Sequence, residues 1–163
     1  MPDPRTVEPL TADEEAAWRA LARAVLVIPR VLDAELLEAE GLSLAEYTVL
    51  MNLSEQPDRS LRMSDLANVA SLSVSGLTRL VDRLDRQELV RRTRCETDGR
   101  GQFAVLTPRG LARLRKAYRT HLAGVREHIM SHLGNLDLAA FASAVADIAD
   151  ERIGPPVRRA GAR

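Results

Sequence analysis

Apolar residues recur at spacings of three and four between residues 18 and 36, which is the pattern of an amphipathic helix. Thr11 and Glu14 form a capping box ahead of this pattern and predict where the helix begins, and Gly41 predicts its end. Because residues 25–28 are all apolar, we also expect the middle of the helix to be buried on more than one side.

A second capping box, Ser43 with Glu46, predicts a helix that continues toward Leu53 and ends in a polar loop. Two short helices follow, at residues 64–70 and 73–86, and only two residues separate them. This layout is typical of a helix-turn-helix motif.

The second of these short helices has two chemically different faces. Its apolar face is formed by Val74, Leu77, Leu80, Val81 and Leu84. Small and basic residues lie along another face, namely Gly76, Arg79, Arg83 and Arg86. Because residues three and four apart share one side of a helix, we expect one face to pack in the core and the other to be basic and exposed.

A β-hairpin is predicted directly after the helix-turn-helix. Residues 89–94 and 102–106 have β character, and the sequence CETDGRG joins them as a turn. Thr107 and Pro108 then have the residue types that favour the N-cap and first position of a new helix.

The two ends of the chain contain more apolar helix than a helix-turn-helix can cover. The helix after Pro108 keeps its apolar spacing as far as Leu133, and a last helix is predicted at residues 138–153. Their apolar stripes therefore require a further covering surface. The segment 154–163 is rich in Pro and Arg, and we expect it to be disordered.

The composition is that of one globular unit. The chain has 163 residues, 45% of them apolar, which is enough to form a real core. Its single cysteine, Cys95, excludes an internal disulfide, and its first residues lack the apolar segment of a signal peptide. We therefore expect a cytoplasmic protein without a membrane span. No phosphate loop or nucleophile motif is present, so we expect neither an enzyme nor a bound cofactor.

The net charge is zero, but the charges are distributed unevenly. Residues 1–58 carry 4 basic and 12 acidic side chains, whereas residues 59–116 carry 13 basic and 6 acidic ones. The middle of the chain is therefore where a polyanion such as DNA would bind. The alternative is that the acidic and basic segments pair with each other within the fold.

A helix-turn-helix followed directly by a β-ribbon predicts a winged helix, so the expected fold class is mostly α with a small β-wing. The second helix fits a major groove, where Arg79 can donate two parallel hydrogen bonds to a guanine. The ribbon tip places Arg100 between two glycines, which would let it enter a minor groove, while other arginines of the ribbon would hold phosphates. The residues that we expect to contact DNA are Ser73, Ser75, Gly76, Thr78, Arg79, Arg83, Arg91, Arg92, Arg94, Asp98 and Arg100.

Three segments resemble the MarR family of bacterial transcription regulators. They are LSLAEYTVLMNLS, MSDLANVASLSVSGLTRLVDRLDRQELVRR and the wing TDGRGQFAVLTPRG. By this resemblance Arg79 and Arg100 are the base-contacting and wing-tip arginines, and Asp98 orients the wing. The chain departs from the family pattern at Glu88, where the family usually has a glycine, so the left-handed cap and the angle of the wing are in question there.

The resemblance implies a homodimer in which the terminal helices of two chains interlock. Residues 1–40 and 108–153 would form the dimerisation region, and residues 41–107 would form the DNA-binding region. The expected function is that of a ligand-responsive repressor which binds palindromic operator DNA. The alternative is an architectural or protein-binding winged helix without sequence preference.

Further residues are candidates for sensing a signal. Trp18 and Tyr47 could stack a small aromatic or anionic effector, although ordinary core packing explains them as well. His128 and His132, with His121 on the same predicted stripe, could contribute to a zinc site, but the alternative is that they edge a dimer interface. Cys95 lies among arginines and could respond to oxidants.

Overall fold

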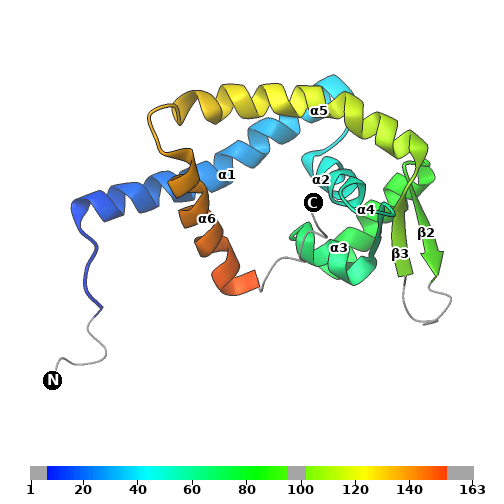
Figure 1. Cartoon of the computed structure of the whole chain (residues 1–163), viewed down its shortest axis with the longest axis horizontal. Coiled ribbons are helices and arrows are strands. Elements are labelled where there is room, and N and C mark those ends of the chain that lie inside the picture. The colour runs from blue at the N-terminus through cyan, green and yellow to red at the C-terminus, as the bar shows by residue number, and fades with distance from the viewer. Residues whose placement is uncertain (1–6, 95–101, 154–163) are drawn as a thin grey trace.

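The structure is a computed structural model that describes residues 7–94 and 102–153 (Figure 1). Its elements are α1 (Ala12–Glu40), α2 (Leu44–Ser54), β1 (Ser60–Arg62), α3 (Met63–Val69), α4 (Val74–Arg86), β2 (Val90–Arg94), β3 (Gln102–Leu106), α5 (Pro108–His128), the 3-10 helix η1 (Met130–His132) and α6 (Leu138–Ile153). The fold is therefore mostly helical with a small sheet, as the sequence predicts. Within the described residues, no helix has the combination of length and apolar character that crossing a membrane requires.

The helix starts are set by local side-chain caps. Thr11 and Glu14 form the predicted capping box at α1, and Ser43 and Glu46 form the second box at α2. Thr107 caps α5 by accepting a hydrogen bond from the backbone N–H of Gly110 at 2.9 Å. These caps satisfy N–H groups that have no partner within the first helical turn.

The sheet has three antiparallel strands in the order β1-β3-β2, and β1 was not predicted from the sequence. Ser60 pairs with Val105, and Val90 pairs with Leu106 on the other side of β3. The predicted hairpin is thus confirmed as β2 and β3. Residues 60–62 follow the predicted polar loop and form the third strand, because β3 offers them a free edge.

The buried core lies between α2, α3, α4 and the sheet, and the inner ends of α1 and α5 close it. Leu50, Leu66 and Leu84 are fully buried at its centre, and Leu36 of α1 joins them. Gly110 permits a close approach here, since a Cβ on this residue would lie 2.0 Å from the carbonyl oxygen of Leu89. This packing fixes the start of α5 against the start of β2.

The outer ends of the terminal helices carry exposed apolar side chains, so the prediction for residues 25–28 is wrong for a single chain. Val25 and Leu26 are 63% and 62% exposed, because no other element of the described chain covers this part of α1. In Figure 1 the N-terminal half of α1 extends away from the winged-helix part, and α6 is drawn across α1, apart from α2 and α4. Every side chain described in α6 is exposed.

The helix after Pro108 is also shorter than predicted. It ends at His128, and residues 130–132 form a single 3-10 turn before α6. The apolar spacing that continues to Leu133 therefore does not mark one continuous helix.

Glu88 occupies the left-handed backbone position at which the family pattern has glycine. Its φ is 59°, and it follows α4 in a Schellman arrangement, in which the N–H of Leu89 bonds to the carbonyl of Leu84 at 2.9 Å. The side chain of Glu88 also pairs with Arg109 at 2.7 Å on the surface.

We expect Glu88→Gly to stabilise the protein by about 0.5–1 kcal/mol. A left-handed conformation costs a residue with a Cβ about 1–2 kcal/mol, whereas the exposed ion pair that is lost contributes at most about 1 kcal/mol. Urea denaturation measures the change, and Arg109→Ala serves as the control that removes the ion pair alone. A less stable Glu88→Gly protein would show that the side chain matters more than the backbone.

Candidate nucleic-acid interface

Helix α4 has the two faces that the sequence predicts, except at its first residue. Leu77, Leu80, Val81 and Leu84 are buried in the core. Val74 is 63% exposed instead of buried, because the core begins one turn later and the first turn of α4 projects beyond it. The opposite face, which carries Arg79, is open to solvent.

The first turn of α4 combines a helix cap with an exposed polar surface. Ser73 accepts a hydrogen bond from the N–H of Gly76 at 3.1 Å, and its hydroxyl lies 3.4 Å from that of Ser75. Ser73 therefore starts the helix, and both serines are exposed, so that either hydroxyl is open to a base or phosphate. Thr78 is half-buried, and Arg79 one residue later is exposed.

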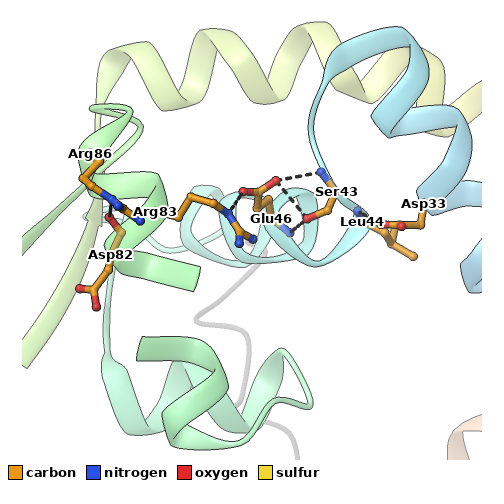
Figure 2. Close-up of polar contacts among 7 residues, drawn as sticks. All are labelled: Asp33, Ser43, Leu44, Glu46, Asp82, Arg83 and Arg86. Carbon is orange, nitrogen blue, oxygen red and sulfur yellow. Dashed lines mark hydrogen bonds and ion pairs between the residues drawn. The ribbon is translucent and has the colours of Figure 1, made fainter. Parts of the chain in front are cut away.

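Arg83, which the sequence analysis assigns to DNA, is bonded to a buried carboxylate of α2. Its Nε donates to Oε1 of Glu46 at 2.6 Å (Figure 2). The other carboxylate oxygen of Glu46 accepts from the backbone N–H of Ser43 at 2.9 Å and from its hydroxyl at 3.0 Å. Burial works to raise the pKa of Glu46, but the hydrogen bonds from Ser43 and Arg83 outweigh it and hold this pKa below its ordinary value.

The same end of α2 is also bonded to α1. Oδ1 of Asp33 accepts a hydrogen bond from the backbone N–H of Leu44 at 2.7 Å. Figure 2 shows the resulting chain of contacts from Asp33 on α1, through the first turn of α2, to Arg83 on α4. Sequence analysis identified Glu46 only as a capping residue.

Arg92 of the wing is bonded to α4 as well. Its Nη1 lies 3.1 Å from Oδ1 of Asp82, and its Nη2 donates to the carbonyl of Thr78 at 3.4 Å. Its Nε is buried and has no hydrogen-bond partner within the described residues. Arg92 therefore holds β2 against α4, whereas the neighbouring Arg91 is exposed.

The other wing residues predicted to contact DNA lie at or beyond the end of β2. Arg94 is the last residue of β2, and its side chain is outside the described part of the chain. Asp98, Arg100 and Cys95 lie in residues 95–101, which are outside the described residues.

The proposed stacking pair Trp18 and Tyr47 is not brought together in one chain. Tyr47 is buried, with its ring centroid 4.4 Å from that of His121 on α5. Trp18 is 60% exposed on the outer part of α1. At 1.5 Å per residue it lies about 27 Å along the helix from Leu36, which belongs to the same core as Tyr47.

The contact between the rings of His121 and Tyr47 was not predicted from the sequence. Burial lowers the pKa of His121, and its Nδ1 is buried without a hydrogen-bond partner among the described residues. Burial also raises the pKa of Tyr47. The two rings pack as part of the contact between α2 and α5.

The predicted histidine stripe does not assemble. His128 ends α5 and lies 2.5 Å from Oε1 of Glu35 on α1, whereas His132 is exposed on η1. Because α5 ends between them, the two histidines are not one turn apart on a single helix. Among the described residues, no three His, Cys, Asp or Glu side chains are grouped so that they could hold a metal.

The His128–Glu35 contact predicts a pH-dependent contribution to stability. The hydrogen bond that the His128 ring donates to the Glu35 carboxylate raises the pKa of His128 above its ordinary value of 6.5. A raised pKa means that the stabilisation is fully present below about pH 6.5 and is lost as the pH rises through the folded-state pKa. We expect His128→Gln to lower the melting temperature most below this pH, with a difference from the wild type that shrinks at higher pH. His132→Gln is the control, and a pH-independent difference would contradict the assignment.

Comparison with known proteins finds transcriptional regulators at the level of both sequence and structure. A family model described as MarR family matches residues 40–101. The HTH-type transcriptional regulator MhqR of Bacillus subtilis (strain 168) is 32% identical over 89 residues, which cover 55% of this chain and 60% of that protein.

Solved structures match over nearly the whole chain. AbsC, a MarR family transcriptional regulator from Streptomyces coelicolor, is 38% identical with a TM-score of 0.82, and the match covers 91% of this chain and 100% of that one. Sco3205, a MarR family transcriptional regulator from the same organism solved in complex with DNA, is 33% identical with a TM-score of 0.83. That match covers 90% of this chain and 92% of that one.

Proposed function

Because the chain belongs to the MarR family of transcriptional regulators, we propose that it binds palindromic operator DNA as a homodimer and responds to a small ligand. The observation that carries this proposal is the two-faced helix α4, which is apolar and buried on one side and basic and exposed on the other. Its exposed face suits the major groove, in which an α-helix fits and base edges are distinguishable.

Within the exposed face, Arg79 is the proposed base-contacting residue. It lies between Ser75 and Arg86, and all three are exposed. Arginine can form two parallel hydrogen bonds with a guanine edge, whereas a serine hydroxyl suits a base or a phosphate. Arg86 and Arg91 are the proposed phosphate contacts, since phosphate contacts fix the position of a protein on the duplex. Arg100 remains the proposed minor-groove contact of the wing, and Asp98 remains the residue proposed to orient the wing.

The proposal of a homodimer is supported by the exposed apolar side chains at both ends of the chain. Trp18, Val25 and Leu26 lie exposed on α1, and Phe141 and Ile148 lie exposed on α6. Monomeric proteins rarely expose contiguous apolar surface of this kind. A second copy would cover both helices and would place two α4 helices on one face, as a palindromic site requires.

We propose an open surface pocket of about 400 Å³ beside the start of α5 as the ligand site. Gln87 and Leu89 line it from the end of α4 and the start of β2, and Arg109, Arg113 and Lys116 line it from α5. These cations suit an anionic effector. They face Glu88 and Glu40, so such an effector would compete with these ion pairs.

Selection from a random duplex library tests the function. We expect the wild-type protein to enrich an inverted repeat whose half-sites are about one helical turn, or a multiple of it, apart. Fluorescence anisotropy should then show tighter binding to this site than to scrambled DNA, and small aromatic acids added to the complex test the ligand response. Equal binding to both DNAs, with a steep loss in salt, would favour the alternative of an architectural protein.

A further inference from the structure

We propose that Glu46 is a positioning residue for DNA recognition, which acts through Arg83 although it does not belong to the DNA-facing surface. The proposal rests on the function proposed above. It assigns Arg83 a structural task at the recognition helix in place of the direct DNA contact that the sequence suggests.

The first argument is the geometry of the ion pair. Glu46 is 5% exposed, and its two carboxylate oxygens divide their contacts, with Oε2 facing Ser43 and Oε1 facing Arg83. A buried carboxylate needs partners for its charge, and Arg83 is the cation that meets it here. The guanidinium is therefore held at its Nε edge and directed toward α2, as Figure 2 shows.

The second argument is that α4 is held on two sides. Arg83 connects it to α2, and the neighbouring Asp82 connects it to Arg92 on the wing. Figure 2 shows Arg83 and Asp82 leaving the helix in different directions. Arg79 lies one turn before Arg83, so the two ion pairs fix the orientation of the face that would enter the groove.

The third argument is charge. An arginine that is paired with a carboxylate contributes little net positive charge to phosphate binding, because the pair is neutral. Loss of Glu46 would release this charge toward DNA and free α4 from α2 at the same time. The predicted signature is therefore a loss of sequence preference without a loss of general DNA affinity.

The experiment compares Glu46→Gln, Arg83→Gln and the double variant in the full-length protein. Each is titrated by fluorescence anisotropy against the site selected by the wild type and against scrambled DNA, at several salt concentrations and well below the melting temperature. Ser43→Ala is the matched control, because it removes the hydroxyl that caps α2 and bonds to Oε2 of Glu46 but removes no atom that contacts Arg83. Circular dichroism establishes that each variant is folded.

We expect Glu46→Gln to reduce the ratio of specific to nonspecific affinity on the order of tenfold, while Ser43→Ala leaves it unchanged. Nonspecific affinity should not fall. The affinity ratio of the double variant should be no lower than that of either single variant, since each single substitution already removes the same ion pair. If Glu46→Gln does not fold, Arg83→Gln alone tests the proposal. This variant should reduce the ratio of specific to nonspecific affinity without reducing the salt dependence of DNA binding.

Two results would overturn the inference. One is an unchanged affinity ratio in folded Glu46→Gln. The other is an Arg83→Gln variant whose salt slope falls by about 1, which is the effect of a lost phosphate contact. If the wild type itself shows no preferred site, the proposed function has failed, and the selection step reveals this before any variant is measured.

Discussion

Phe141→Asp is expected to separate the proposed dimer into monomers. Phe141 lies on α6 in line with Leu138 and Val145, and all three side chains are exposed in the described chain. In a dimer the new carboxylate would be buried without a cation, at a cost of about 3–5 kcal/mol. The dimer dissociation constant should therefore rise by at least about two orders of magnitude.

Sedimentation velocity over a range of protein concentrations measures this change. Ser143→Asp is the matched control, because it places the same charge on the same helix about 200° around from Phe141. The winged helix should stay folded in both variants, since α6 contributes no residue to the described core. A Phe141→Asp protein that remains dimeric at the wild-type concentration would remove α6 from the interface.

Arg79→Ala is expected to cost about 1–3 kcal/mol on the selected site and to relax preference at one base position. The guanidinium of Arg79 is exposed, and its loss leaves the buried face of α4 intact, so the protein should keep its melting temperature. Repeating the selection with the variant measures the change in preference directly.

Arg86→Ala is the variant to compare with Arg79→Ala, because Arg86 is a proposed phosphate contact. It should weaken binding to all sequences alike and reduce the salt slope by about 1. Arg92 cannot serve this purpose, because its guanidinium is bonded to Asp82 and Thr78. If Arg79→Ala behaved like Arg86→Ala, sequence preference would have to come from another part of α4 or from the wing.

The fold could be predicted where the signals are local. The capping residues at Thr11, Ser43 and Thr107 lie within three residues of the N–H groups they satisfy, so the sequence alone shows where α1, α2 and α5 begin. The strand Ser60–Arg62 could not be found in this way. It is only three residues long, and its partner β3 begins 40 residues later in the chain.

The exposed end of α1 shows a different limit of sequence patterns. The apolar residues 25–28 indicate burial, but a pattern does not state whether the covering surface belongs to the same chain or to a second one. Within the described chain Val25, Leu26 and Val27 are exposed, and Ile28 is half-buried.

At the candidate site, helical spacing predicts which side chains are exposed but not which side chains they contact. The exposed position of Arg79 follows from helical spacing, which also separates it from the buried leucines. The partner of Arg83 is 37 residues away in sequence, and that of Arg92 is on the preceding helix, so their spacing gives no sign of either ion pair. The sequence therefore predicts both arginines as DNA contacts, and only the structure shows the carboxylates that pair with them.

The two faces of α4 also bear on how regulators of this kind acquire new targets. Ser75 and Arg79 stand apart from the leucines that hold the helix in place, so exchanging them should alter the preferred operator at little cost in stability. Divergence after gene duplication could then proceed by single substitutions. The same logic sets a rule for transplanting a foreign recognition helix into this scaffold, because the graft must retain Arg83 opposite Glu46 and Asp82 opposite Arg92, whatever sequence its outer surface carries.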